Sequence, residues 1–491
     1  MIFKENMLKM NVWHQVLSLE KTMHRKDFLL YQYALLLLRC CLTPLLVLIF
    51  APLLSSLKKR LNFEKQNAVD PLSGSWGDGQ SADVAFEVSS EGEFEQVLPL
   101  LNVCLANGQK VELFYSSPSL EVKTGRFARQ YPKQVRRLRI PLLTCFPWSV
   151  FGGQNFFKMV TAKKLVLCRY DFYPELLIYG SRKDVEFILV SATLKGKEKG
   201  LGTLHYDYFQ ALFHLFDFIL TATEVDEQRF KALGLEGEKI LPFDLRVLQI
   251  KERVQKSEET LSKFSTMTLL RTFIEGQKRE KRVLMGSCWP KEMSVFSDAG
   301  LLEKISQKKL LFFLAPHKLD SAFLLELKNS FKKWSGQTAN IPLYFVDLRE
   351  GKEHWDLFFN KWEKKPGPVV LTTPAVLLEM YTFFGNVFVG GGHGRSIHSV
   401  LEPFLAGAQV FCGPKTYRST EFDLIQDISP KSIFIVHELR MFASILLKEF
   451  QNAQNLDIRK TFISSMSERF WVLLKYFGLR TEEKCWKKMS I

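Results

Sequence analysis

The residues best suited to bind a ligand lie in a glycine-rich stretch of the C-terminal half, FVGGGHGRSIHSVLEP, which begins at Phe388. The pattern predicts a strand that runs into three glycines and a helix that begins near Ser399. Glycines let the backbone approach a phosphate closely, and a helix start offers free N–H groups and a positive dipole end. A carboxylate about one turn into that helix can accept two ribose hydroxyls, whereas a structural turn is the alternative explanation of the glycines. The candidate nucleotide-binding residues here are Gly390, Gly391, Gly392, Arg395, His398, Ser399 and Glu402.

Two common nucleotide-binding patterns are absent from this stretch. It has no GxxxxGK[ST] sequence, which excludes a P-loop. It also has no strand-proximal GxGxxG with a ribose-binding acid further on, so a hydride-transfer cofactor is not supported.

A second candidate site follows the first predicted strand, in the segment Ser89-Ser90-Glu91-Gly92-Glu93. Doubly wound sheets bind ligands at the carboxyl ends of their strands, so a carboxylate here could act as general base toward a hydroxyl nucleophile. Glu93 is the candidate base. The alternative is an acid at a helix start that only complements the helix dipole.

Weaker candidates lie at the ends of other predicted strands. Pro316 and His317 end a strand of the second half, where His317 could donate to a phosphate or be an ordinary loop histidine. Asp171 and Glu175 follow a strand of the first half and could line a cleft. The candidate acceptor or cleft residues are Ser90, Asp171 and Lys415.

Two series of apolar runs that alternate with helical patterns position these residues. The first series is Val84–Ser90, Val111–Tyr115, Leu165–Cys168, Phe187–Ser191 and Phe218–Thr221. The second series is Val283–Gly286, Leu311–Ala315, Leu343–Val346, Val369–Leu371, Val387–Val389, Val410–Phe411 and Ile433–Val436. Strands that alternate with helices indicate a parallel sheet covered on both faces. The sequence therefore predicts an α/β protein with two Rossmann-like, doubly wound domains and a cleft between them.

Composition predicts the boundaries of the parts. The chain has 491 residues, of which 46% are hydrophobic and 24% charged, so it is long enough for two globular domains and is not a disordered chain. The predicted parts are a basic tail at 1–27, a membrane anchor at 28–57, a Rossmann-like domain at 58–248, a charged helical connector at 249–282, a second Rossmann-like domain at 283–455 and an amphipathic helix at 456–491. The last helix is expected to pack across the domain junction or to touch a membrane.

The apolar segment and the basic ends favour a membrane surface. Between Asp27 and Lys58 the only charge is Arg39, and the uncharged run Cys40–Leu57 is near the ~20 residues that span a bilayer. Basic residues flank both ends, so the positive-inside rule gives no orientation. We expect a permanent anchor that either spans the bilayer or lies in one leaflet. Most of the net charge of +15 lies in residues 1–60 and 456–491. The alternative to a membrane-binding role for this charge is that these lysines only keep the protein soluble. A nucleic-acid binder more often has a basic stripe across its folded domain, so no nucleic-acid partner is predicted.

Cysteine and histidine spacing predicts neither a disulfide scaffold nor a metal site. The eight cysteines include no CxxC pair, and the nine histidines show no HExxH or clustered spacing. Several cysteines lie in apolar runs, as reduced buried cysteines do, so the body is expected to face the cytoplasm.

Together these signals resemble the Kdo transferases of lipopolysaccharide assembly, which have the GT-B glycosyltransferase fold. Those enzymes transfer 3-deoxy-D-manno-octulosonic acid (Kdo) from CMP-Kdo to a lipid A precursor. The resemblance extends from about residue 28 over most of the chain, and its glycine loop is the most specific part. The matching segments are Leu29-Leu30-Tyr31, Ser90-Glu91-Gly92-Glu93 against Ser-Val-Gly-Glu, Asp171-Phe172-Tyr173-Pro174 against acid-Leu-Trp-Pro, Gly391–Pro403 against the glycine loop with Leu-Glu-Pro, and Gly413-Pro414.

Four positions depart from the family pattern. Ser399 stands where the family has Asn, Thr193 where it has Arg, Pro242 where it has Lys, and Trp289 where it has His. The loss of two cations and a histidine changes the surroundings expected for an anionic donor.

The resemblance implies an inverting transfer in which Glu93 deprotonates the acceptor hydroxyl and Glu402 holds the ribose. The glycine loop, with Arg395, His398 and Lys415, would stabilise the leaving CMP. It also implies an acceptor-binding first domain, a nucleotide-sugar-binding second domain, and no cofactor besides the donor substrate CMP-Kdo. The implied partners are a lipid A precursor and membrane lipids, at the bacterial inner membrane with the catalytic body in the cytoplasm. The alternatives are a membrane-associated GT-B transferase for another nucleotide sugar and a non-catalytic, membrane-bound relative.

Overall fold

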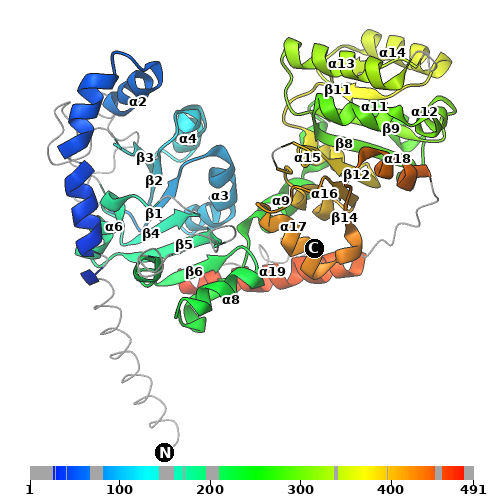
Figure 1. The fold of residues 1–491 in the computed structure, drawn as a ribbon. Coiled ribbons are helices and arrows are strands. Elements are labelled where there is room, and N and C mark those ends of the chain that lie inside the picture. The colour runs from blue at the N-terminus through cyan, green and yellow to red at the C-terminus, as the bar shows by residue number, and fades with distance from the viewer. Residues whose placement is uncertain are drawn as a thin grey trace, which may run out of the picture. The chain divides into compact units, whose positions relative to one another are not determined.

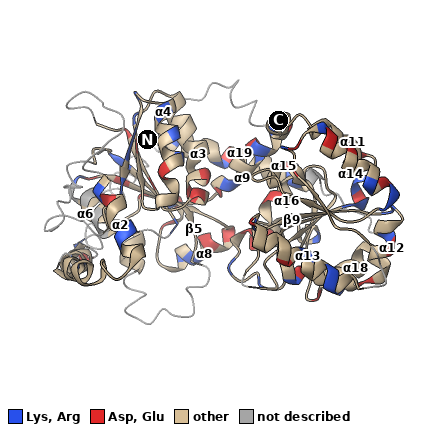
Figure 2. Ribbon diagram, turned by 90° about the horizontal axis from the view of Figure 1, so that it is seen from above, with Lys and Arg blue, Asp and Glu red and all other residues tan. Residues whose placement is uncertain are grey.

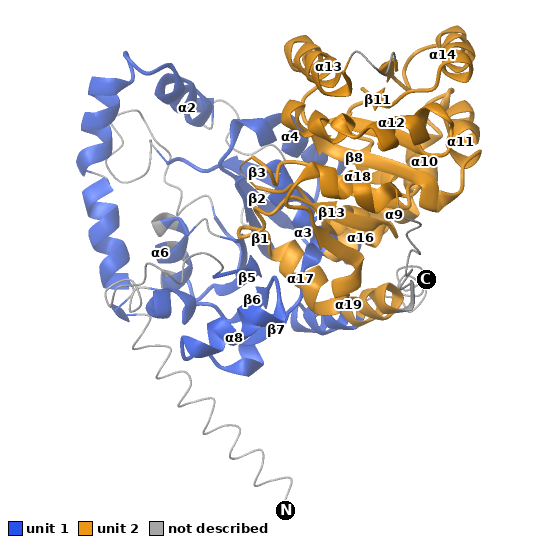
Figure 3. Cartoon of the chain, turned by 45° about the vertical axis from the view of Figure 1, so that its right-hand side comes forward, with its two compact units in different colours: residues 1–246, 468–488 blue, residues 247–467, 489–491 orange. Residues whose placement is uncertain are grey.

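The computed structural model describes residues 26–66, 81–142, 160–194, 209–336, 341–447 and 456–479, apart from residues 28, 40, 170, 171 and 395. The chain divides into two compact units, coloured separately in Figure 3: residues 1–246 with 468–488 form unit 1, and residues 247–467 with 489–491 form unit 2. Residues 249–282, predicted as a connector, therefore belong to unit 2.

Unit 1 is built on a seven-stranded sheet with the order β3-β2-β1-β4-β5-β6-β7, in which all paired strands are parallel. Its strands are β1 (Val84–Val88), β2 (Val111–Tyr115), β3 (Val135–Arg139), β4 (Lys164–Cys168), β5 (Glu186–Ala192), β6 (Phe218–Thr221) and β7 (Ile240–Pro242). Its helices include α2 (Ser55–Lys65), α3 (Glu91–Ala106), α4 (Glu121–Gln130), α6 (Pro174–Arg182) and α8 (Glu224–Ala232). Helices α3 and α6 lie on opposite faces of the sheet (Figure 1).

The five strands predicted in this unit are confirmed, and two further strands were missed. β3 has the sequence VRRLR, which reads as a charged surface segment. In the fold, Arg136 pairs with Glu112 of β2, and Arg139 pairs with Glu121 at the start of α4. Because these arginines are neutralised by carboxylates of neighbouring elements, a strand with three cations can lie in a buried sheet. The second missed strand, β7, is only three residues long.

Unit 2 has a second seven-stranded parallel sheet, with the order β10-β11-β9-β8-β12-β13-β14. Its strands are β8 (Arg282–Cys288), β9 (Leu311–Pro316), β10 (Tyr344–Val346), β11 (Val369–Leu371), β12 (Asn386–Val389), β13 (Gln409–Cys412) and β14 (Ile433–Ile435). All seven were predicted, with ends that shift by one or two residues. Its helices are α9 (Leu245–Gln255), which begins in unit 1, then α10 (Ser257–Leu261), α11 (Met267–Glu275), α12 (Ala299–Ser306), α13 (Ser321–Ser335), α14 (Lys352–Lys364), α15 (Leu377–Tyr381), α16 (Leu401–Leu405), α17 (Thr420–Ile428) and α18 (Leu439–Leu447).

The strand order places a topological switch point in each sheet. In unit 1 the chain builds outward from β1 to β2 and β3 on one side and continues with β4 on the other. In unit 2 the corresponding neighbours are β8 and β12. Doubly wound sheets bind ligands outside the carboxyl ends of the strands at such points. Two Rossmann-like domains in one chain confirm the predicted α/β, GT-B fold class.

The C-terminal helix α19 (Leu456–Tyr476) is a packed helix. Its predicted apolar positions Met466, Phe470 and Leu474 are buried. Within unit 1, Phe470 lies 5.9 Å from Phe243 between ring centroids, and Tyr476 stacks on Phe218 at 4.6 Å. Residues 480–491 of the predicted tail lie outside the described residues.

Candidate functional site

Glu93 lies in the first turn of α3, immediately after the carboxyl end of β1. The Ser90 hydroxyl caps the helix by accepting the Glu93 N–H at 3.3 Å. The Glu93 Oε2 accepts two hydrogen bonds, from the Ser89 N–H and the Ser89 hydroxyl, both at 2.7 Å. Among the described residues nothing donates to Oε1. The half-buried carboxylate is thus held by one oxygen and has the other available to accept a proton.

The neighbouring Glu91 has different surroundings. Its exposed side chain lies 3.9 Å from the Lys123 ammonium of α4, which also pairs with Glu95. Glu91 therefore belongs to a surface charge cluster. Glu93, in contrast, is oriented by Ser89 at the end of β1.

The end of β4 adds a cation that sequence reasoning missed. Burial and then the Glu93 carboxylate raise the pKa of the Cys168 thiol, so the charge of Glu93 acts at this strand end. The next residue, Arg169, has φ of 60°, a strained conformation for a non-glycine residue. Its Nε is buried and has no hydrogen-bond partner among the described residues. The only signal in the sequence was its place directly after a strand. The predicted cleft residue Asp171 and the side chain of Glu175 lie outside the described residues.

In unit 2, three aromatic side chains stack at the carboxyl ends of neighbouring strands. Trp289 follows β8, His317 follows β9, where Pro316 is the last strand residue, and His398 lies in the loop after β12. The rings of Trp289 and His317 stack with centroids 4.5 Å apart, and those of His317 and His398 stack at 4.4 Å. The indole N–H of Trp289 donates to Nε2 of His398 at 3.4 Å. The sheet thus brings together the predicted nucleotide-binding residues His317 and His398 with Trp289, which stands where the Kdo transferase pattern has a histidine.

The pKa values of both histidines are lowered, and that of His398 corrects one expectation. Burial, and then the neighbouring His317, lower the pKa of His398 to about 4. Burial, and then Lys318, lower the pKa of His317 as well. His398 was expected to add positive charge for a phosphate, and instead it can contribute only as a neutral hydrogen-bonding and stacking group.

The glycine loop is fastened to the end of β8 by its own N–H groups. The N–H of Gly390 donates to the Gly286 carbonyl at 2.9 Å, and the N–H of Gly391 donates to Oε1 of Glu292 at 2.8 Å. The φ of Gly391 is 95°, which favours glycine, and a Cβ at Gly390 would collide with the Ser287 carbonyl oxygen. The first two glycines therefore serve close packing of the loop. Whether Gly392 contacts a nucleotide stays a prediction.

Two other side chains fix this region. Glu292 also accepts the Trp289 N–H at 2.8 Å, and burial raises its pKa to about 7. The Lys415 ammonium donates to the Gly394 carbonyl and so closes the loop from the β13 side. The predicted ligand Arg395 lies outside the described residues.

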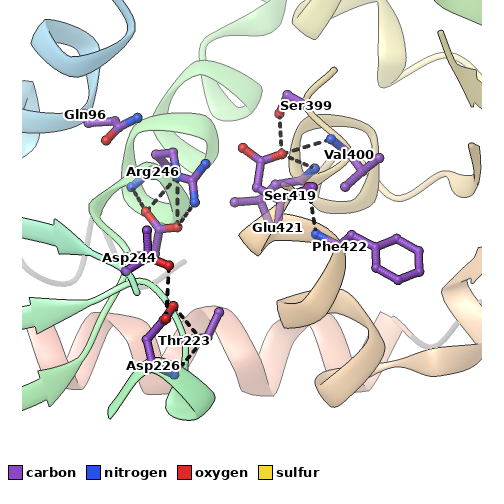
Figure 4. Close-up of polar contacts among 12 residues, drawn as sticks. Gln96, Thr223, Asp226, Asp244, Arg246, Ser399, Val400, Ser419, Glu421 and Phe422 are labelled. Atoms are coloured by element: carbon purple, nitrogen blue, oxygen red, sulfur yellow. Dashed lines mark hydrogen bonds and ion pairs between the residues drawn. The ribbon is translucent and has the colours of Figure 1, made fainter. Parts of the chain in front are cut away.

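The helix start after the glycine loop is occupied, which corrects a second expectation. Helix α16 begins at Leu401 and is only five residues long. Oε2 of Glu421, from the first turn of α17, accepts the Ser399 hydroxyl at 2.9 Å, the Val400 N–H at 2.9 Å and the Leu401 N–H at 3.1 Å (Figure 4). Two of the N–H groups expected here for a phosphate, those of Val400 and Leu401, are therefore already bound by a carboxylate. Beside them, burial and then Glu421 raise the pKa of Glu402 to about 7.

Comparison with known proteins finds one family that is similar to part of the chain. Residues 55–244 match the model of the 3-deoxy-D-manno-octulosonic-acid transferases (kdotransferases). This part of the chain is similar to the Kdo transferase family. The 3-deoxy-D-manno-octulosonic acid transferase of Chlamydia muridarum (strain MoPn / Nigg) is 20% identical over 290 residues, which are 56% of this chain and 58% of that protein. The alignment thus spans little more than half of the relative's length.

The solved structures that are similar to this chain have lower sequence identity. The C-terminal CMP-Kdo binding domain of WaaA from Acinetobacter baumannii is 13% identical, has a TM-score of 0.28 and covers 44% of this chain and 97% of that domain. A glycosyltransferase from Rickettsia africae ESF-5 is 9% identical, has a TM-score of 0.44 and covers 81% of this chain and 98% of that one. With TM-scores this low, the fold class rests on the strand order.

Three departures from the Kdo transferase pattern have structural partners in this chain. The Thr193 hydroxyl donates to Oδ1 of Asp226 at 3.0 Å. Asp226 also accepts a hydrogen bond from the Thr223 hydroxyl in the same buried network (Figure 4). The Pro242 carbonyl at the end of β7 accepts a hydrogen bond from Arg469 of α19. The third departure is Trp289, whose indole stacks on His317 and donates to His398. The family's two cations and histidine are thus replaced by groups that are integrated into the fold.

Proposed function

We propose that the protein transfers Kdo from CMP-Kdo to a lipid A precursor, with inversion at the anomeric carbon. We place it at the bacterial inner membrane with its catalytic body in the cytoplasm. The observation that carries the proposal is the family match over residues 55–244, the part of the chain that contains Glu93. The carboxyl end of β1 lies beside the switch point of its sheet, where a ligand is expected in a doubly wound domain.

In the proposed reaction, Glu93 is the general base. The acceptor hydroxyl oxygen forms a bond with the anomeric carbon of Kdo, and Oε1 of Glu93 takes the hydroxyl proton as that bond forms. The bond from the anomeric carbon to the phosphate oxygen breaks, and CMP leaves with the electron pair. Ser89 fixes Oε2 through two hydrogen bonds, so the basic oxygen has a defined direction. General base catalysis of this kind contributes roughly 10²–10⁴ in rate.

The second domain is proposed to bind the cytidine of the donor. Trp289, His317 and His398 offer stacked aromatic rings at strand ends, and base–aromatic stacking contributes about 1–3 kcal/mol per base. Because Glu421 occupies the α16 start and His398 is neutral, the phosphate charge would be met chiefly by Lys415 and by Arg395.

The test is acceptor-dependent release of CMP by the full-length protein, purified in detergent. We expect CMP to appear only when both CMP-Kdo and a lipid A precursor are present. The same assay with other CMP- and UDP-sugars tests a second candidate function, a transferase for a different nucleotide sugar. That candidate is favoured by the lowered pKa values of His317 and His398 beside Trp289, because a lower pKa reduces the positive charge available to an acidic sugar donor. If no donor were turned over, a non-catalytic, membrane-bound protein would replace both transferase functions as the proposal.

A further inference from the structure

The apolar helix Leu29–Phe50 packs one side against the rest of unit 1. It is 22 residues long and apolar enough, by length and composition, to cross a membrane. Its less exposed residues recur every three or four positions, as on one face of a helix. They are Leu29, Gln32, Tyr33, Leu36, Arg39, Thr43, Pro44 and Val47. All its other described residues are exposed. The helix therefore has one narrow face against the protein and a wide face away from it.

Named contacts hold this narrow face to the body of unit 1. Leu36 packs with Ile178 of α6, with Leu29 and Tyr33 against the same cluster. Arg39 donates to the Leu142 carbonyl at 3.1 Å, so the one charge of the apolar segment points toward the body.

The same backbone position is tied to α2. The Leu142 N–H donates at 2.9 Å to Oε1 of the buried Glu64, which Arg60 also contacts at 2.6 Å. Arg60 in turn donates to the Ile140 carbonyl at 2.8 Å. The apolar helix and α2 are thus both docked on the end of β3.

The outward face is a continuous apolar surface. Its large side chains are more exposed than in an ordinary core helix: Leu30 is 74% exposed, Leu38 56%, Leu45 57% and Ile49 59%. Soluble surfaces rarely carry such a large contiguous apolar patch without a partner. After the helix, Lys58 and Lys59 of α2 are exposed, which adds positive charge beside the patch.

We infer that this helix lies in the plane of the membrane surface, with its outward face in an anionic lipid leaflet and its inward face on unit 1. A helix that crosses the bilayer must be surrounded by lipid or by other spanning segments over the whole hydrocarbon thickness. Here a polar domain lies along it, and an upright helix would carry the charges of that domain into hydrocarbon, at several kcal/mol each. An in-plane amphipathic element inserts only about 5–10 Å and leaves the body in water. The exposed lysines favour anionic headgroups as the partner.

This arrangement deepens the proposed function, because it keeps unit 1 at the leaflet in which a lipid acceptor would lie. It rests on that function only for the identity of the acceptor. Topology and sugar transfer are separate measurements, so either one can fail while the other holds.

The first experiment measures which side of the membrane each helix end faces. Asp27→Cys and Lys58→Cys, in the otherwise unchanged full-length protein, are treated with an impermeant, high-mass maleimide in inverted vesicles and in spheroplasts. An extra gel shift relative to wild type reports each new thiol. We expect both positions to react in inverted vesicles and neither in spheroplasts. Reaction of one position from each side would overturn the in-plane assignment in favour of a spanning helix.

The second experiment tests the outward face. The double variant Leu38→Asp/Leu45→Asp should move at least tenfold more protein into the soluble fraction and bind anionic phosphatidylglycerol vesicles at least tenfold more weakly. The matched control is Leu325→Asp/Leu357→Asp, at residues 58% and 52% exposed on α13 and α14, and it should stay with the membrane. Unchanged membrane retention of the first variant would overturn the proposal. A wild-type dimer in solution that binds no vesicles would also overturn the proposal, because a second copy would then cover the apolar face.

Discussion

At the residue scale, the acids near the strand ends differ in how their carboxylate oxygens are bound. Glu93 has one oxygen fixed by Ser89 and the other without a hydrogen bond among the described residues. In contrast, the carboxylate oxygens of Glu292 and Glu421 accept hydrogen bonds from backbone N–H groups of the glycine loop and of the α16 start. Three acids near strand ends thus have different roles, which residue type alone did not distinguish.

The stacked histidines give a prediction about protonation. Burial is the first cause of the low pKa of His398, and Trp289 is one of its covering groups. Trp289→Ala admits water to the ring, so the pKa of His398 should rise from about 4 toward the ordinary value of 6.5. The measurement is an NMR titration of the His398 ring in both proteins. An equal midpoint in the variant would show that Trp289 does not control the charge of this site.

Glu402 gives a prediction about stability and pH. Its pKa is about 7 in the folded chain against an ordinary 4.5, so the folded state binds this proton more tightly than the unfolded state. The free energy of unfolding of the second domain should therefore fall as pH rises from about 5 to 7, by on the order of 2 kcal/mol from this group. Glu402→Gln cannot ionise, so urea denaturation at pH 5 and at pH 8 should show a smaller loss in the variant. A larger loss in the variant would reverse the assignment.

At the element scale, the strands were more predictable than the helix starts. Twelve predicted strands are present because buried parallel strands are continuous apolar runs, and helical patterns separated these runs. β3 was missed because its arginines are neutralised by Glu112 and Glu121, which are distant in sequence. The start of α16 was misjudged for a related reason, since its capping carboxylate comes from Glu421 on the next helix. Local sequence patterns do not contain such tertiary partners.

The cap on α16 gives a prediction for this element. Glu421→Ala leaves the Val400 and Leu401 N–H groups without their acceptor, and loss of a helix cap costs about 0.5–2 kcal/mol. The thermal midpoint of the second domain should fall by several degrees, and the pKa of Glu402 should move down because a like charge is removed. An exposed acid on the same domain, Glu326→Ala on α13, is the control and should change neither. An unchanged midpoint in Glu421→Ala would mean that water replaces the cap at no cost.

At the scale of the whole molecule, the described part of the chain carries charges of both signs. Figure 2 shows Lys and Arg interspersed with Asp and Glu on the helices of both units. The sequence correctly placed an apolar segment near the N-terminus, yet which face of it is covered became visible only in the fold. Arg39 is the instructive residue, because in the sequence it interrupts an apolar run and in the fold it faces the Leu142 carbonyl.

Membrane association follows from this arrangement. If the outward apolar face provides most of the affinity, 1 M salt should leave most of the protein on membranes, because salt screens the lysine contribution within about 3 Å but does not weaken apolar burial. Detergent should extract it. Sedimentation of washed membranes checks this, and release by salt alone would assign the attachment to charge.

The measurement that tests the central claim most directly is the mass of the lipid product. Full-length wild type, Glu93→Gln and Glu91→Gln are each incubated with CMP-Kdo and a lipid A precursor, and the lipid is analysed by mass spectrometry. Wild type and Glu91→Gln should add Kdo to the lipid. Glu93→Gln, which keeps the side-chain size but cannot accept the proton, should be slower by at least ~10² while it still binds the donor. A wild-type protein that leaves the lipid unchanged, or a Glu93→Gln variant as fast as wild type, would contradict the account.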